Sequence, residues 1–164
     1  MDIRIAERSD WSRIVDLYNE AVVTGYSTAD TALATVDSKR SWLESHSADR
    51  YPIYVAELDS LVVGWCSCSP YRPGRLALRR TAEISYYQAR SHWRRGIGSE
   101  LVRHAIADAS RLDLRTFFGI LLESNVGSAA LLERLGFEKW GFLPGVADFD
   151  GEEIGHAYWG KRVG

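Results

Sequence analysis

The feature that most constrains the fold is a strand, a glycine pair, a helix and a second strand in direct succession. Residues 81–88 are rich in β-forming side chains, and the segment that Gly96 opens carries apolar residues at helical spacing up to Ala109. Residues 116–122 form a continuous apolar run, which is typical of a strand buried on both faces. A strand–helix–strand crossover of this kind places its two strands parallel. The sequence therefore predicts a parallel pair inside a mixed α/β sheet that has helices on both faces.

The rest of the chain supplies further strands and helices around that unit. Period-2 and helical patterns, turn residues and caps locate them. The expected elements are a strand at 3–5, helices at about 11–23 and 38–47, strands at 53–58 and 61–68, a helix at 125–135 and final strands at 137–143 and 154–161. The predicted order is β-α-α-β-β-β-α-β-α-β-β, in one domain that spans residues 1–164.

Charge and hydropathy exclude several classes of protein. The net charge is −2 and no basic block stands out beyond residues 72–80, which argues against a nucleic-acid surface. No run approaches the length of a membrane span, and the first residues lack an apolar signal segment, so we expect a cytoplasmic protein. Cys66 and Cys68 lie two apart in a strand and have no second pair to complete a zinc site. We expect buried, reduced thiols and no metal.

The glycine pair is the first feature with chemical meaning. Gly96 and Gly98 at a helix start allow close backbone approach, and the free N–H groups of the first turn attract an anion. Arg94 and Arg95 add positive charge. Leu101 occupies the third glycine position of a dinucleotide site, and no phosphate-loop lysine motif is present. The pattern favours a pyrophosphate held without magnesium, although a G-x-G alone fits an ordinary tight turn equally well.

Two motifs about 30 residues apart then resemble one family. Arg95-Gly96-Ile97-Gly98 is similar to the coenzyme A loop of the GNAT acetyltransferases. Asn125-x-x-Ser128 followed by Leu135-Gly136-Phe137 is similar to the second cofactor segment of that family. Thr81-x-Glu83-x-Ser85-x-Tyr87 and much of the N-terminal half resemble the phosphinothricin and methionine sulfoximine acetyltransferase subgroup. The resemblance implies the acyl-CoA N-acyltransferase fold, with a central mixed, mostly antiparallel twisted sheet.

The resemblance also implies a role for each matching residue. The cofactor would be acetyl-CoA, with no metal. Its pantetheine arm and thioester would be held through backbone hydrogen bonds by Tyr86, Tyr87 and Gln88, and Asn125 would also bond the pantetheine. Its pyrophosphate would be held by Arg94, Arg95, Gly96, Ile97, Gly98 and Ser99. Glu83 would be the general base of a direct acetyl transfer. Arg75, together with Ser85 and Glu83, would bind an acidic substrate, and Arg72 is a further candidate.

Glu83 also has a physical case of its own. An amine is mostly protonated at neutral pH and must lose a proton before it attacks a thioester. Glu83 is the only carboxylate on its strand, and burial there would raise its pKa towards the useful range. The competing interpretation is a structural ion pair with Arg79 or Arg80.

Three positions depart from the family pattern. Trp93 replaces the usual Gln or Arg before the glycines, and Leu132 stands where the family has a Tyr or His near the departing sulfur. The substrate loop reads Arg75-Leu76-Ala77-Leu78-Arg79 and lacks the tyrosine of the subgroup. The thiol can leave as a thiolate with water as the proton source, and Tyr87 or Tyr158 is an alternative acid.

The predicted function is therefore acetyl transfer to the primary amine of a small, amino-acid-like molecule. Two alternatives stay open. One is a GNAT enzyme acting on another amine, such as a protein N-terminus, a polyamine or an aminoglycoside. The other is a non-catalytic module that binds coenzyme A, because fold does not guarantee activity. The resemblance implies a homodimer.

Overall fold

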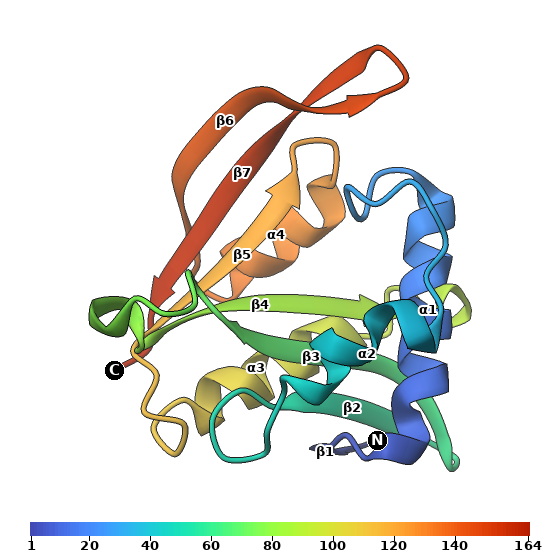
Figure 1. Ribbon diagram of the computed structural model, residues 1–164, viewed down its shortest axis with the longest axis vertical. Helices are drawn as coiled ribbons and strands as arrows, with labels where there is room; N and C mark the ends of the chain where they lie inside the picture. Colours follow the sequence, from blue (N-terminus) through green and yellow to red (C-terminus); the bar gives the residue numbers. More distant parts are fainter.

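One seven-stranded sheet in the order β1-β2-β3-β4-β5-β7-β6 organises the computed structural model, which describes residues 1–164 (Figure 1). Only β4 and β5 are parallel; every other neighbouring pair is antiparallel. The strands are β1 (Asp2–Ile5), β2 (Ile53–Leu58), β3 (Leu61–Pro70), β4 (Thr81–Gln88), β5 (Thr116–Leu122), β6 (Glu138–Phe149) and β7 (Glu152–Arg162). The helices are α1 (Trp11–Thr24), α2 (Val36–Glu44), α3 (Ile97–Asp108) and α4 (Val126–Arg134), with short 3-10 turns at Arg8–Asp10, Leu76–Leu78 and Arg90–His92. The predicted order and the mixed α/β sheet are confirmed.

Two apolar cores cover the two faces of this sheet. On one face, residues of α3 such as Leu101 and Val102 pack with Cys66, Cys68 and Leu132. Both cysteines are free, and burial raises the pKa of Cys68 to about 12. The other face carries α1 and α2. There the buried Trp65 donates its indole N–H to the Ile14 carbonyl at 3.0 Å, so the polar atom of this large side chain is satisfied.

The parallel pair is short, and the sheet opens because of it. Thr81–Glu83 of β4 pair with Thr116–Phe118 of β5, and pairing ends there. β4 remains paired with β3 as far as Gln88, and β5 remains paired with β7 along its whole length. From Ile84 onward, the backbone groups of β4 that face β5 therefore have no strand partner. This opening between β4 and β5 is what the site uses.

Several predicted boundaries were wrong for local reasons. α2 begins at Val36 rather than residue 38, because Thr35 and Ser38 form a reciprocal capping box. Their side chains accept from each other's backbone N–H at 3.1 and 2.9 Å. Asp10 directly precedes α1, but its side chain does not cap the helix. Its carboxylate accepts from the Glu7 N–H at 2.8 Å and pairs with Arg4 at 2.7 Å.

The last two strands are longer than predicted and form an arm. The stretch between the two predicted final strands is mostly β-strand, and the turn is limited to Asp150 and Gly151, whose φ angles are 53° and 95°. Trp140 lies over Gly160 and Phe142 lies over Gly155, since a Cβ added at either glycine would be within 2.3 Å of the ring. The far half of the arm extends beyond the helices (Figure 1). None of the helices has the length and apolar character to cross a bilayer.

Candidate active site

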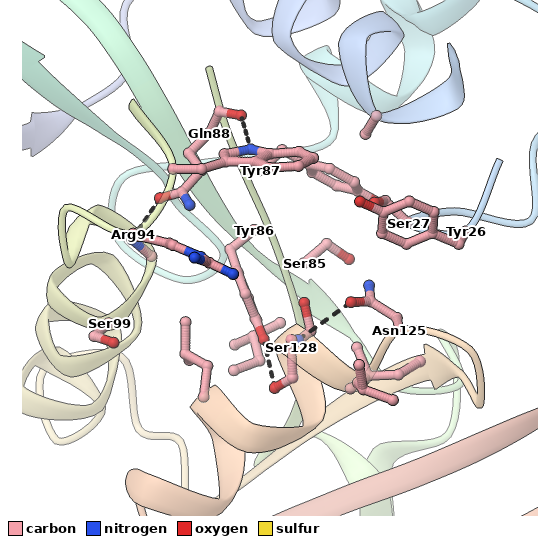
Figure 2. A pocket seen from close by; sticks show the side chains of 18 of the residues that line it. Tyr26, Ser27, Ser85, Tyr86, Tyr87, Gln88, Arg94, Ser99, Asn125 and Ser128 are labelled. Atoms are coloured by element: carbon pink, nitrogen blue, oxygen red, sulfur yellow. Dashed lines mark hydrogen bonds between the residues drawn. The ribbon is translucent and has the colours of Figure 1, made fainter. Parts of the chain in front are cut away.

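A cavity of about 760 Å³ fills the opening between β4 and β5. It lies against the start of α3, the start of α4 and the segment that follows α1 (Figure 2). This volume is within the range of small-molecule sites. The predicted site residues that line it are Ser85, Tyr86, Tyr87, Gln88, Arg94, Gly96, Gly98, Ser99 and Asn125.

The loop before α3 is shaped for an anion at one end of the cavity. Gly96, the N-cap of α3, has φ 83°, a conformation that side chains rarely adopt. Arg94 also has a positive φ, 62°, and its side chain reaches the cavity wall. A Cβ on Gly98 would lie 3.1 Å from Cδ1 of Leu131, so this glycine permits the close approach of α4. The N–H groups of the first helical turn and an arginine therefore converge here.

In the middle of the cavity, hydrogen bonds join β4 to α4 and fix the start of α4. The Tyr86 hydroxyl donates to the Ser128 carbonyl at 3.3 Å, and burial raises the Tyr86 pKa. Asn125 caps α4: its Oδ1 accepts from the Ser128 N–H at 3.1 Å, and the residue is buried. The cap uses the carbonyl oxygen of Asn125 and leaves its NH₂ group free to donate to a ligand.

Glu83 lies where β4 separates from β5. It is the last residue of β4 that pairs with β5, where its partner is Phe118. On the other side of β4, its partner is Ser69 of β3. The side chains of Glu83, Ser85 and Tyr87 alternate with the buried Ala82 and Ile84, so they face the α1–α2 side of the sheet. Burial raises the pKa of the Glu83 carboxyl. The first cavity-lining residue beyond it is Ile84, so Glu83 adjoins the end of the cavity.

The competing interpretation of Glu83 as half of an ion pair is wrong. Arg80 pairs with Asp113 at 3.0 Å, and Arg79 donates to the Leu76 carbonyl at 3.2 Å. The Glu83 carboxylate forms no ion pair, and burial alone accounts for its raised pKa. A half-buried carboxylate with no charged partner is unusual unless its chemistry is used.

Four other expected site residues do not line the cavity, and the exposed Arg72 is one of them. Arg95 is exposed, and the Ile97 side chain is buried in the core, so Ile97 offers the site only its backbone. Arg75 is exposed in the loop after β3, before the 3-10 turn at Leu76–Leu78.

Leu132 is fully buried, and a Cβ on Gly119 would lie 2.6 Å from its Cδ1. Leu132 therefore belongs to the core and not to the cavity wall.

The structure adds residues that the sequence reasoning missed. Tyr26 and Ser27 enter the cavity from the segment after α1, where no pattern singled them out (Figure 2). Arg134, at the end of α4, brings a second cation to the wall. Its place directly before Leu135-Gly136-Phe137 was the available signal. Trp93, which appeared only as a departure from the family pattern, also lines the cavity.

An aromatic group lies beside Glu83 on the sheet. Phe118 is the partner of Glu83 across the parallel pair. Its ring centroid lies 5.0 Å from that of Tyr71, 5.5 Å from that of Trp140 and 6.4 Å from that of Tyr158. These four rings, which we call the aromatic wall, come from the loop after β3 and from β5, β6 and β7. The wall gives the neighbourhood of Glu83 an apolar side that suits the aliphatic part of a small molecule.

A mixed sheet that opens between two parallel strands, next to a glycine-rich helix start, defines the class of acyl-CoA-type acyltransferases. The chain belongs to the GNAT acetyltransferase family, whose domain model matches residues 2–138. It is an enzyme of the acyltransferase class, an N-acetyltransferase.

Individual relatives agree with this assignment. The chain is 35% identical to YwnH of Bacillus subtilis over 164 residues, 99% of each chain. It is 32% identical to the phosphinothricin N-acetyltransferase of Streptomyces coelicolor, over 86% of this chain and 84% of the relative. It is 28% identical to the L-methionine sulfoximine/L-methionine sulfone acetyltransferase of Salmonella typhimurium, over 89% and 85%. The structure of YncA from Salmonella typhimurium with its cofactor acetyl-CoA matches with a TM-score of 0.92 and 26% identity, over 100% of this chain and 94% of that one.

Proposed function

We propose that this protein transfers an acetyl group from acetyl-CoA to the primary amine of a small, amino-acid-like acceptor. The relatives that act on phosphinothricin or on methionine sulfoximine and methionine sulfone support this class of acceptor. The observation that carries the proposal is one continuous arrangement. Helix-start amides and arginines lie at one end of a cavity, and a carboxylate without a charged partner adjoins the other.

The residues present fit coenzyme A. The first-turn N–H groups of α3, with Arg94 and Arg134, would hold the diphosphate. The backbone groups of β4 that lack a strand partner, and the free NH₂ of Asn125, would bind the amides of the pantetheine arm. When bound, acetyl-CoA supplies a thioester carbonyl that an unprotonated amine can attack.

The protein itself must remove the proton from the amine before the amine attacks the thioester. Glu83 would accept it, either directly or through one water molecule. Burial raises the pKa of Glu83 towards the range in which a carboxylate can both accept and release a proton near neutral pH. The side chain needs no release from an ion pair before it acts, because Glu83 has none.

The acceptor would lie on the α1–α2 side of the sheet, between Glu83 and the aromatic wall. The aromatic wall suits a short aliphatic side chain. Arg75 is exposed in the loop that leads to β4 and would bind the carboxylate or a second acidic group of the acceptor. Ser85, on the same row as Glu83, would donate a hydrogen bond.

An acceptor panel tests this proposal. Thiol release from acetyl-CoA is measured with methionine sulfoximine, methionine sulfone, phosphinothricin, spermidine, an aminoglycoside and a short peptide with a free N-terminus. We expect the three amino-acid-like compounds to give the highest kcat/KM. Preference for spermidine, the aminoglycoside or the peptide would contradict the acceptor class, and no release with any amine would contradict the proposed transfer.

Further proposals concern the protein around the site. We propose a homodimer, because β6 is the last strand of the sheet and exposes Leu143 and Val146 on the arm. We also propose that residues 1–164 act as one domain and that the protein works in the cytoplasm. The two buried free cysteines are consistent with a reducing compartment.

A further inference from the structure

One side chain already uses an amide of the anion site. Gln88, the only glutamine of the chain and the last residue of β4, accepts from the Gly98 N–H with its Oε1 at 3.0 Å (Figure 2). Gly98 is the second residue of α3. The first intrahelical bond runs from the Glu100 N–H to the Gly96 carbonyl at 3.0 Å, so the Gly98 N–H precedes the helical ladder. This N–H belongs to the set that would bind a diphosphate.

The position of Gln88 favours that contact. Its backbone is paired in register with Gly64 of β3, and its carbonyl accepts from the indole N–H of Trp93 at 3.4 Å. Its side chain is half-buried at the wall of the same cavity. The acceptor atom on Gln88 must be the carbonyl oxygen, since the partner is an N–H group, so the orientation of the carboxamide is set by the bond itself.

We propose that Gln88 is an internal competitor of the diphosphate and thereby sets the affinity for coenzyme A. This inference rests on the function proposed above. The carboxamide oxygen is a neutral acceptor, and a diphosphate oxygen is a charged one that forms the stronger bond to an N–H. The ligand therefore displaces Gln88, but its net gain is reduced by the hydrogen bond that is lost. The reduction falls only on ligands that carry the diphosphate, so Gln88 also narrows the difference in affinity between coenzyme A and pantetheine.

Calorimetry on three proteins tests this competition. Coenzyme A and pantetheine, which lacks the diphosphate, are titrated into the wild type, Gln88→Met and Gln88→Glu. Methionine keeps the length of the side chain and removes the acceptor, so we expect the Kd for coenzyme A to fall by about two- to tenfold, as the loss of one hydrogen bond allows. Glutamate places a charged acceptor on Gly98 and repels the diphosphate, so the Kd should rise. The Kd for pantetheine should stay unchanged in both variants.

A control variant and a measurement on the wild type complete the test. Ser27→Ala changes a cavity-lining residue in the segment that follows α1 and not at the start of α3, so it should leave the ratio of the two Kd values unchanged. Selective isotope labelling of the single glutamine gives the NMR signal pair of one side-chain NH₂ group, without any substitution. That signal should shift with coenzyme A and stay in place with pantetheine.

The possible results separate this inference from the proposed function. The proposed competition would be contradicted by an unchanged or higher Kd for coenzyme A in Gln88→Met, or by a glutamine signal that does not shift when coenzyme A is added. Either result would leave the proposed acetyl transfer unaffected. A wild type that binds no coenzyme A would overturn both. If Gln88→Met does not fold, the labelled wild type decides alone.

Discussion

At the scale of single residues, the proposed reaction depends most on Glu83 as the general base. Gln has the same shape and cannot accept the proton, so we expect Glu83→Gln to lower kcat/KM by about 100-fold or more. As the pH is lowered, the wild-type rate should begin to fall at a pH above the range in which an ordinary glutamate becomes protonated, because burial raises the pKa of Glu83. Steady-state kinetics across pH give both quantities.

The matched control for that substitution is Glu20→Gln, at a carboxylate that lines the cavity. Glu20 accepts from the Arg90 N–H at 2.8 Å and lies on α1, away from the aromatic wall. It should change kcat/KM by only a few-fold. Equal losses in the two variants would contradict the role of Glu83 as the base.

The same residue has an effect on stability with a definite sign. A carboxyl whose pKa is raised by folding stabilises the protein below its unfolded pKa, and this contribution is lost as pH rises through the folded pKa. Glu83→Gln should therefore melt at a higher temperature than the wild type at pH 7, and the difference should shrink as the pH falls towards 4. A Glu83→Gln protein that is less stable than the wild type at pH 7 would mean that Glu83 has a stabilising partner.

At the scale of elements, the packing of α4 against β5 depends on a missing side chain. Gly119 faces Leu132, and an alanine there would place its Cβ 2.6 Å from the Leu132 Cδ1. We expect Gly119→Ala to lower the free energy of unfolding by about 1–3 kcal/mol, as overpacking does. Gly127, on α4, has no atom within 4 Å of an added Cβ, so Gly127→Ala should instead stabilise by up to about 1 kcal/mol. Urea denaturation that gives both variants the same sign would contradict this packing.

The sequence predicted those elements whose local signals agree with their tertiary setting. The bounds of β4 and β5 were correct, because each is a compact run of strand formers that ends where the chain turns. The hairpin arm was underestimated, because Pro144 and Gly145 lie within β6, where the register with β7 shifts. A break in pairing of that kind reads as a strand end in sequence but is tolerated at the edge of a sheet.

The candidate site was predictable in the same uneven way. Gly96 and Gly98 at the start of α3, and Asn125 before α4, were found because each belongs to a short local motif. Tyr26 and the aromatic wall were not found, because they meet only through the tertiary fold. The bond between Gln88 and Gly98 joins a strand end to a helix start across ten residues, and no spacing rule selects it.

At the scale of the whole molecule, the arm predicts how two copies associate. We expect light scattering to give twice the mass of one chain. Leu143→Glu with Val146→Glu should shift that mass towards one chain, since both side chains are exposed on β6 and a buried charge is strongly unfavourable. Leu61→Glu, at the turn between β2 and β3, should leave the dimer intact. A monomeric wild type would contradict the proposed dimer and leave the transferase site unaffected.

The central claim is that the start of α3 holds the diphosphate of acetyl-CoA, and its most direct test is calorimetric titration of acetyl-CoA into the wild type, Arg94→Glu and Arg72→Glu. The two arginines are matched, since both are exposed with positive φ, 62° and 58°, but only Arg94 lines the cavity. We predict binding to the wild type and to Arg72→Glu with similar Kd, and a Kd at least about tenfold higher for Arg94→Glu, the loss expected for a charged contact. No binding to the wild type, or equal binding to all three proteins, would contradict the account.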